Sequence, residues 1–164
     1  HLAKENCNIY ISDIYEDRLK EVASKYKTVV VDIDEIYDVE VDIYAPCALG
    51  ATVNDQTLER LKCSIIAGSA NNQLKDEQVH GTLCVEKGIL YVPDFLINAG
   101  GLINVYQELI GYNKEKAYAK AEKIYDLTLE LLNKAENDGI TTHQAAMKIA
   151  EKRIKDIGKV KSTF

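Results

Sequence analysis

Short apolar runs rich in β-branched and aromatic residues alternate along this chain with segments of helical periodicity. Each run is brief and largely apolar, as a strand buried on both faces should be. Strands that alternate with helices are typical of a parallel sheet covered by helices. The predicted strands are residues 8–12, 28–31, 42–44, 64–67 and 89–92. The sequence therefore predicts an α/β fold built on a parallel sheet.

Two helical segments between these strands are predicted from the spacing of their apolar residues. The first carries Tyr15, Leu19, Val22 and Tyr26 on one face. The second contains Leu58 and Leu61, and either Asn54 or Asp55 is expected to cap its N-terminus.

Residues 113–164 are predicted to form two further helices with no strand of their own. Gly139 suits a left-handed C-cap for the first, and Thr141 and Gln144 have the spacing of a capping box for the second. Their apolar faces consist of Ala117, Ala121, Ile124, Leu131 and Ala135, and of Ala146, Ile149, Ala150, Ile154 and Ile157. Because these helices cannot extend the sheet, we expect them to pack back on the domain of residues 1–112 or on a second domain that this sequence does not contain.

The charge balance makes nucleic acid and membrane surfaces poor candidate partners. The formal net charge is −6, so the chain has no basic field that could hold phosphate backbones or anionic lipids. No apolar run approaches the roughly 18 to 20 residues that span a bilayer, and the N-terminus lacks a signal-peptide pattern. The four cysteines are widely spaced and have no histidine at metal-ligand spacing, which favours free thiols over a metal site. We therefore expect a cytoplasmic domain that binds a small ligand.

Asp13 lies where an extended apolar run gives way to a helical pattern. In a dinucleotide-binding fold, an acid at the end of the second strand accepts hydrogen bonds from the adenosine ribose and repels a 2′-phosphate, which favours NAD over NADP. The alternative is that Asp13 only caps the following helix.

A glycine-rich phosphate loop should precede such an acid by about 20 residues, yet residues 1–12 contain no glycine. Either the fold binds no dinucleotide, or its first strand and glycine turn lie before residue 1. We favour the second explanation, because residues 1–6 resemble the end of a helix that runs into a strand.

Three long blocks carry a more specific signal. They are DIYAPCALGATVND (residues 42–55), IIAGSANNQL (65–74) and YVPDFLINAGGLINVYQEL (91–109). In this order they resemble the cofactor domain of leucine dehydrogenases, within the glutamate, leucine, phenylalanine and valine dehydrogenase family. The stretch GYNKEKAYAKAEKIYD resembles the next helical segment of the same family, so the likeness covers nearly the whole chain.

The resemblance implies an incomplete Rossmann-like domain of an enzyme that oxidatively deaminates branched-chain L-amino acids (leucine, valine and isoleucine) to 2-oxo acids and ammonia. Hydride passes to NAD. In the family, the catalytic lysines and aspartate lie in a preceding substrate domain, so no catalytic residue is expected in this chain. We expect the chain alone to be inactive and to bind NAD poorly, and the complete protein to be a homo-oligomer.

Ala45, Pro46, Cys47 and Ala48 end a predicted strand, at the edge where an open parallel sheet binds its ligand. The resemblance implies that they line the cleft near the riboses of NAD. By themselves they would suggest only a turn, with Pro46 as the strand breaker.

Asn71 follows another predicted strand, among small residues that let a flat cofactor approach the backbone. The resemblance places it near the nicotinamide ribose or carboxamide. It could also cap a helix that begins near Gln73.

Asn98 precedes two glycines at the start of a helical segment, whose free N–H groups favour an anionic carboxylate. The resemblance places Asn98 against substrate and cofactor, and Leu102 and Val105 in the apolar pocket for the substrate side chain. Plain core packing is the competing role for Leu102 and Val105.

Four further titratable residues receive no role. Asp94 is expected to be an exposed loop acid and Glu108 a solvated helix acid, rather than the two members of an acid–base pair. His80 and His143 have no visible partner in the sequence.

Two other functions remain open. A relative that prefers phenylalanine, valine or glutamate would differ in pocket residues from the absent domain. A module that kept the fold but lost the catalytic half would sense nucleotide or support oligomerisation. A glycine-rich loop and a lysine-bearing domain encoded upstream of His1 would favour the enzyme.

Overall fold

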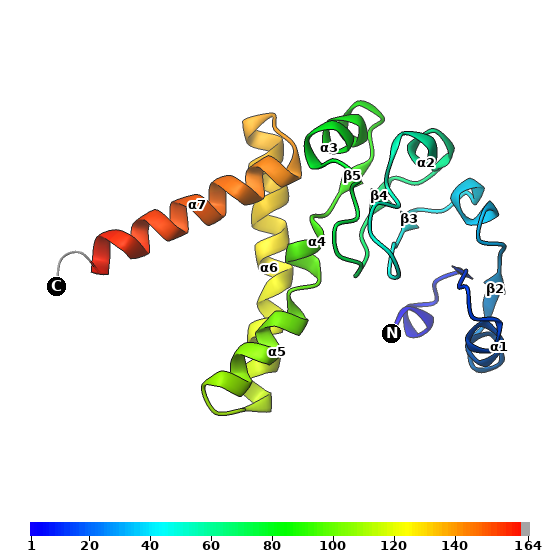
Figure 1. The fold of residues 1–164 in the computed structure, drawn as a ribbon, viewed down its shortest axis with the longest axis horizontal. Coiled ribbons are helices and arrows are strands. Elements are labelled where there is room, and N and C mark those ends of the chain that lie inside the picture. Colours follow the sequence, from blue (N-terminus) through cyan, green and yellow to red (C-terminus); the bar gives the residue numbers. More distant parts are fainter. Residues whose placement is uncertain (162–164) are drawn as a thin grey trace. The chain divides into compact units, whose positions relative to one another are not determined.

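A computed structural model describes residues 1–161 and divides the chain into two compact units. Unit 1 comprises His1–Glu40 and Arg60–Lys62, and unit 2 comprises Val41–Glu59 and the residues from Cys63 onward. Figure 1 shows the chain coloured along the sequence, with most of its helices and strands labelled.

Unit 1 is a β–α–β unit flanked by two short 3-10 helices. Its elements are η1 (Leu2–Glu5), β1 (Ile9–Ile11), α1 (Glu16–Lys25), β2 (Thr28–Val30) and η2 (Glu35–Asp38). β1 and β2 pair in parallel, and α1 packs against β2. Arg60 also belongs to this unit, and its guanidinium group donates to both carboxylate oxygens of Asp38, at 2.7 and 3.1 Å.

The strands predicted in unit 1 are confirmed, but their expected burial on both faces is wrong. Val29 and Val30 of β2 are about half exposed. The physical reason is that α1 covers only one side of a sheet that has two strands in the described residues.

Unit 2 is built on a sheet of three parallel strands in the order β3-β4-β5. Its elements are β3 (Ile43–Tyr44), α2 (Asp55–Arg60), β4 (Ile65–Ile66), α3 (Glu77–Glu86), β5 (Leu90–Tyr91), α4 (Asp94–Ile97), α5 (Gly100–Leu109), α6 (Lys114–Asp138) and α7 (Thr142–Lys161). The last residue of α2, Arg60, counts with unit 1. The three strands predicted in this part of the chain are confirmed, and so is the α/β class.

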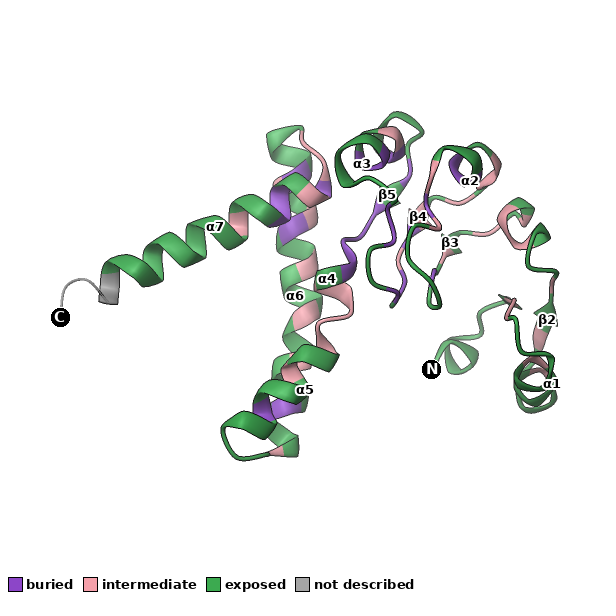
Figure 2. Cartoon of the chain, viewed as in Figure 1, coloured by how far each residue is buried: buried purple, intermediate pink, exposed green. Residues whose placement is uncertain are grey.

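The core of unit 2 has two parts, visible as purple segments in Figure 2. At the sheet, Leu58 of α2, Ile66 of β4 and Cys84 of α3 are almost completely buried. Where α6 meets α7, a second cluster is formed by Leu131, Ala135, Ala145 and Ala146, with Leu96, Leu132, Ile140 and Ile149 packed against it. The small alanines allow the two helix backbones to approach closely at this point.

The caps predicted for the N-terminus of α2, the C-terminus of α6 and the N-terminus of α7 are confirmed. Asn54, rather than Asp55, caps α2, because its Oδ1 accepts two backbone N–H groups of the first turn at 3.0 and 3.1 Å. Gly139 ends α6 with a φ of 61°. Thr141 and Gln144 exchange hydrogen bonds of 3.2 and 3.3 Å at the start of α7.

The two C-terminal helices pack within unit 2. α6 contacts α5 and α4, and α7 contacts α6 and α3. The division into residues 1–112 and 113–164 stays a prediction. Within residues 1–161, no helix combines the length and apolar character that crossing a bilayer requires.

Candidate functional site

Three loops leave the carboxyl ends of β3, β4 and β5 along one edge of the sheet of unit 2. They begin at Ala45, Ala67 and Val92, directly after the strands. Open parallel sheets bind their ligands at this edge. Eight of the predicted site residues come after these strands, namely Ala45, Pro46, Cys47, Ala48, Asn71, Asn98, Leu102 and Val105.

The β3 and β4 loops are packed together through Pro46 and Gly68. The N–H of Ala70 donates to the carbonyl of Pro46 at 2.9 Å. A Cβ atom on Gly68 would overlap the backbone N and O of Pro46, so only glycine permits this approach. Pro46 is buried, whereas Cys47 and Ala48 are exposed. The loop is therefore anchored at Pro46 and presents the next two residues to solvent.

Asn71 and Asn98 meet through their side chains. The Nδ2 of Asn98 donates to the Oδ1 of Asn71 at 2.6 Å and to the carbonyl of Ser69 at 3.3 Å. This bond fixes the orientation of both amides. It leaves the Nδ2 of Asn71 as a donor and the Oδ1 of Asn98 as an acceptor for a bound molecule.

Gln73 shapes the β4 loop from inside. Its side chain is fully buried, and its Nε2 donates to the carbonyls of Gly68 and Ala70 at 2.6 and 2.9 Å. The helix expected near Gln73 is absent from the described structure, so a capping role for Asn71 is wrong. The next helix is α3, and its N-cap is Asp76. Sequence reasoning missed Gln73 because its partners are backbone atoms of the preceding turn, which no residue pattern reveals.

Asp94 is buried, not an exposed loop acid as the sequence suggested. Only 8% of its surface is exposed. Its Oδ2 accepts the N–H of Asn72 at 2.5 Å, and its Oδ1 accepts the hydroxyl of Tyr91 at 3.3 Å. Burial, and then the charge of Asp94, raise the pKa of Tyr91, so its hydroxyl stays protonated and able to donate. No local sequence pattern reveals this burial, because the N–H that binds the carboxylate lies 22 positions earlier in the chain.

Asn98 lies between two helices, as the C-cap of α4 and two residues before the start of α5. The predicted helix start at Gly100 is confirmed. On α5, Leu102 is 75% exposed and Val105 is 53% exposed. The competing role of core packing is therefore wrong for both residues in this chain, which leaves their apolar side chains open to a ligand or to another part of a larger protein. Glu108 is exposed, as expected.

Asp13 follows β1 in unit 1. Its Oδ1 accepts the N–H of Tyr15 at 2.9 Å, which closes a turn before α1. Tyr15, not Asp13, is the N-cap of α1. The alternative that Asp13 caps this helix is therefore wrong. Its contact with an adenosine ribose stays a prediction.

His80 and His143 both have partners, contrary to the expectation from the sequence. The Nδ1 of buried His80 accepts the N–H of Asp76 at 2.9 Å, and its Nε2 lies 3.6 Å from the carboxylate of Asp55. The Nε2 of His143 lies 3.2 Å from the carboxylate of Glu77. The contacts with Asp55 and Glu77 join neighbouring helices of unit 2 and lie outside the three loops.

The cysteines of residues 1–161 are free thiols. Burial raises the pKa of Cys84 to about 11 and also raises that of Cys63, so both stay protonated at neutral pH. No group of three or more His, Cys, Asp or Glu side chains in the described part of the chain is arranged to hold a metal ion.

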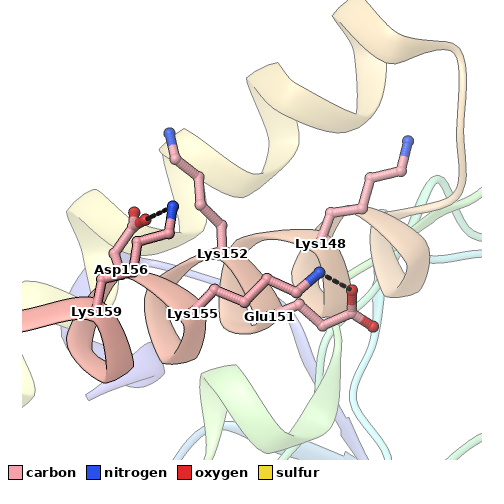
Figure 3. A pocket seen from close by; sticks show the side chains of 6 residues that line it. All are labelled: Lys148, Glu151, Lys152, Lys155, Asp156 and Lys159. Atoms are coloured by element: carbon pink, nitrogen blue, oxygen red, sulfur yellow. Dashed lines mark ion pairs between the residues drawn. The ribbon is translucent and has the colours of Figure 1, made fainter. Parts of the chain in front are cut away.

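A shallow hollow on α7 is lined only by charged side chains of that helix, which Figure 3 shows: Lys148, Glu151, Lys152, Lys155, Asp156 and Lys159. Glu151 pairs with Lys155 at 4.0 Å, and Asp156 pairs with Lys159 at 3.9 Å. Pairs at this spacing are ordinary on a solvated helix face. We assign no binding role to this surface.

Comparison with known proteins gives a consistent result. A family model described as Glutamate/Leucine/Phenylalanine/Valine dehydrogenase matches residues 8–161. The chain is 51% identical over its full length to a leucine dehydrogenase from Thermoactinomyces intermedius, of which it covers 44%. It is 47% identical to a phenylalanine dehydrogenase from Bacillus thermotolerans, over 96% of this chain and 42% of the relative.

The fold also matches a solved structure. The crystal structure of L-tryptophan dehydrogenase from Nostoc punctiforme aligns with a TM-score of 0.94 and 46% identity, over 97% of this chain and 48% of that chain. The chain thus spans less than half of the length of each of these relatives.

Proposed function

Since the chain belongs to the glutamate/leucine/phenylalanine/valine dehydrogenase family, we propose that it is the greater part of the cofactor domain of an NAD-dependent amino-acid dehydrogenase. The complete protein oxidatively deaminates leucine, valine and isoleucine to 2-oxo acids and ammonia, and acts in the cytoplasm as a homo-oligomer. The observation that supports this proposal most strongly is the hydrogen-bonded pair of Asn71 and Asn98 at the carboxyl edge of the sheet.

The amide pair fits the nicotinamide end of NAD. A primary carboxamide offers one C=O acceptor and one NH2 donor group, which complement the free Nδ2 of Asn71 and the free Oδ1 of Asn98. Bound NAD accepts the hydride that leaves the amino acid. In this proposal Asn71 and Asn98 orient the carboxamide, and the exposed part of the loop of residues 45–48 lines the cleft beside the riboses.

Asp13 provides the selection of NAD over NADP. Its carboxylate accepts hydrogen bonds from the hydroxyls of the adenosine ribose and repels a 2′-phosphate. The hydrogen bond from the N–H of Tyr15 to Oδ1 already holds the carboxylate in one orientation.

Leu102 and Val105 form part of the substrate pocket. Both are aliphatic, lie one helical turn apart on α5 and are exposed in this chain. Aliphatic walls favour the transfer of an aliphatic side chain out of water, which supports leucine, valine and isoleucine as substrates. The relatives named for phenylalanine and tryptophan make an aromatic L-amino acid the alternative.

The remaining chemistry belongs to the rest of a longer protein. Removal of a proton from the amino group requires a general base with a tuned pKa and a fixed positive charge nearby. In this proposal a preceding domain supplies the lysines, the aspartate and the glycine-rich phosphate loop. The chain alone is therefore inactive.

An assay of the complete protein tests the proposal. NADH formation is followed with leucine, valine, isoleucine, phenylalanine, tryptophan and glutamate in turn, and with NADP in place of NAD. We expect the highest kcat/KM with the branched-chain substrates and NAD. Activity with glutamate alone would refute the branched-chain assignment, and NAD binding without turnover of any amino acid would favour a nucleotide-sensing module.

A further inference from the structure

The backbone of the β4 loop is held in an unfavourable conformation beside Asn71. Asn72 has a φ of 52°, in the left-handed region that residues with a side chain rarely adopt. Such a conformation persists only where the surrounding structure holds it. Asn72 is held on both sides, because its N–H donates to Asp94 and its carbonyl accepts the N–H of Ala51 at 2.7 Å.

Asp94 makes hydrogen bonds at Asn98 and at Asn72, the neighbour of Asn71. Its carboxylate binds the N–H of Asn72, which comes directly after Asn71. Its backbone carbonyl accepts the N–H of Asn98 at 2.9 Å. One residue therefore fixes the backbone on either side of the bond between Asn71 and Asn98.

The carboxylate of Asp94 is itself held in place. The hydroxyl of Tyr91 donates to Oδ1 and accepts the N–H of Asp94, both at 3.3 Å. The backbone of Tyr91 is secured in turn, since its carbonyl accepts the hydroxyl of Thr142 at 2.7 Å. All of these groups are buried, where an unpaired N–H or carboxylate would be costly.

We propose that Asp94 is a positioning residue that brings the side chains of Asn71 and Asn98 together at the cofactor site. This inference rests on the proposed function for its effect on catalysis. Asp94 acts through the two asparagines and does not itself touch cofactor or substrate.

Kinetics of the complete enzyme test this role. In Asp94→Ala the N–H of Asn72 loses its acceptor, and we expect the KM for NAD to rise and kcat/KM to fall by about 10- to 100-fold, as for a small misplacement of binding groups. Asp94→Asn retains a side-chain oxygen for this N–H and should restore most of the loss. Glu86→Gln, which changes an exposed acid at the end of α3, should leave kcat and KM as in the wild type.

Hydrogen exchange of the backbone amides of residues 68–72 gives a second readout that does not depend on activity. We expect faster exchange in Asp94→Ala and near wild-type exchange in Asp94→Asn. If Asp94→Ala does not fold, Tyr91→Phe carries the same test, because it removes the hydroxyl that holds the carboxylate; a smaller rise in KM for NAD is then expected.

The outcomes separate the two proposals. A fall in kcat with unchanged KM for NAD and unchanged exchange of residues 68–72 would mean a merely structural role and overturn the inference. A wild-type enzyme without amino-acid dehydrogenase activity would overturn the proposed function, while hydrogen exchange would still decide whether Asp94 holds the loop.

Discussion

Asn98 donates a side-chain hydrogen bond to Asn71 across 2.6 Å, although the two residues are 27 positions apart in the sequence. They meet because β4 and β5 are adjacent and parallel, so the segments after them leave the sheet at the same edge. The bond turns the remaining donor of one amide and the remaining acceptor of the other toward a ligand. In the proposed enzyme this pair is the centre of the nicotinamide site.

Replacement of Asn98 by alanine removes the bond to Asn71 and the proposed contact with the cofactor. We expect kcat in the complete protein to fall by about 100-fold or more, the usual effect of losing one oriented polar group at a reacting centre. Steady-state kinetics with saturating leucine and NAD measure this. Asn137→Ala, an exposed position near the end of α6, is the matched control. Unchanged kinetic constants in Asn98→Ala would contradict the site.

Two glycine-to-alanine substitutions should have opposite effects on stability. Gly68→Ala forces a Cβ into the backbone of Pro46, and we expect a loss of about 1–3 kcal/mol, as for overpacking elsewhere. Gly158→Ala adds a Cβ in open space on α7 and should stabilise by about 0.5–1 kcal/mol through helix propensity. Urea unfolding of the complete protein compares them. A Gly68→Ala protein as stable as the wild type would show that the two loops do not pack so closely.

Substitutions on α5 test the substrate pocket. We expect Val105→Ala and Leu102→Ala to lower kcat/KM for leucine by roughly 10- to 200-fold relative to a bulkier aromatic substrate, the range for a changed apolar contact in a specificity pocket. The free energy of unfolding should change little, because both side chains are exposed in this chain. Leu109→Ala, also exposed on α5, should not alter the ratio. An equal change in the ratio of kcat/KM for leucine to kcat/KM for the aromatic substrate in all three variants would rule out a specific pocket at Leu102 and Val105.

Ion pairs of Asp138 should make the packing of α6 against α7 depend on pH. Asp138 lies 3.0 Å from Lys134 and 3.6 Å from Lys148 of α7, and the hydrogen bond from Lys134 is the main cause that holds its pKa below 3.8. The pKa of Asp138 is therefore lower in the folded than in the unfolded chain. Its ion pairs stabilise the folded state at pH values above the unfolded-state pKa, and this small stabilisation is lost as the pH falls through the folded-state pKa.

Urea unfolding of Asp138→Asn at neutral and at acidic pH checks this expectation. The variant should be slightly less stable than the wild type at neutral pH, and the difference should vanish well below pH 3.8. Asp126→Asn, an exposed acid on the same helix, serves as the control. A difference that stays constant with pH would show that charge pairing is not its cause.

Local patterns were sufficient to predict much of the fold. The strands were predictable from short apolar runs. Gly139 identified the C-terminus of α6, and Thr141 with Gln144 identified the N-terminus of α7, because caps depend on neighbouring residues. The family resemblance placed both Asn71 and Asn98 near the cofactor, and parallel strands bring their carboxyl ends to one edge, but the hydrogen bond between the two side chains was not predicted.

Contacts between distant residues were not predictable in this way. The burial of Asp94 depends on the N–H of Asn72, 22 positions earlier. The carboxylates that face His80 and His143, those of Asp55 and Glu77, lie on other helices. The half-exposed β2 was missed for a different reason, because an apolar run specifies a tendency to be buried but not the element that covers it.

A crystal structure of the complete protein with bound NAD tests the central claim most directly. Our account predicts that the nicotinamide carboxamide or its ribose lies within hydrogen-bond distance of Asn71 and Asn98, and that the adenosine ribose contacts Asp13. A cofactor bound away from the loops after β3, β4 and β5 would contradict it.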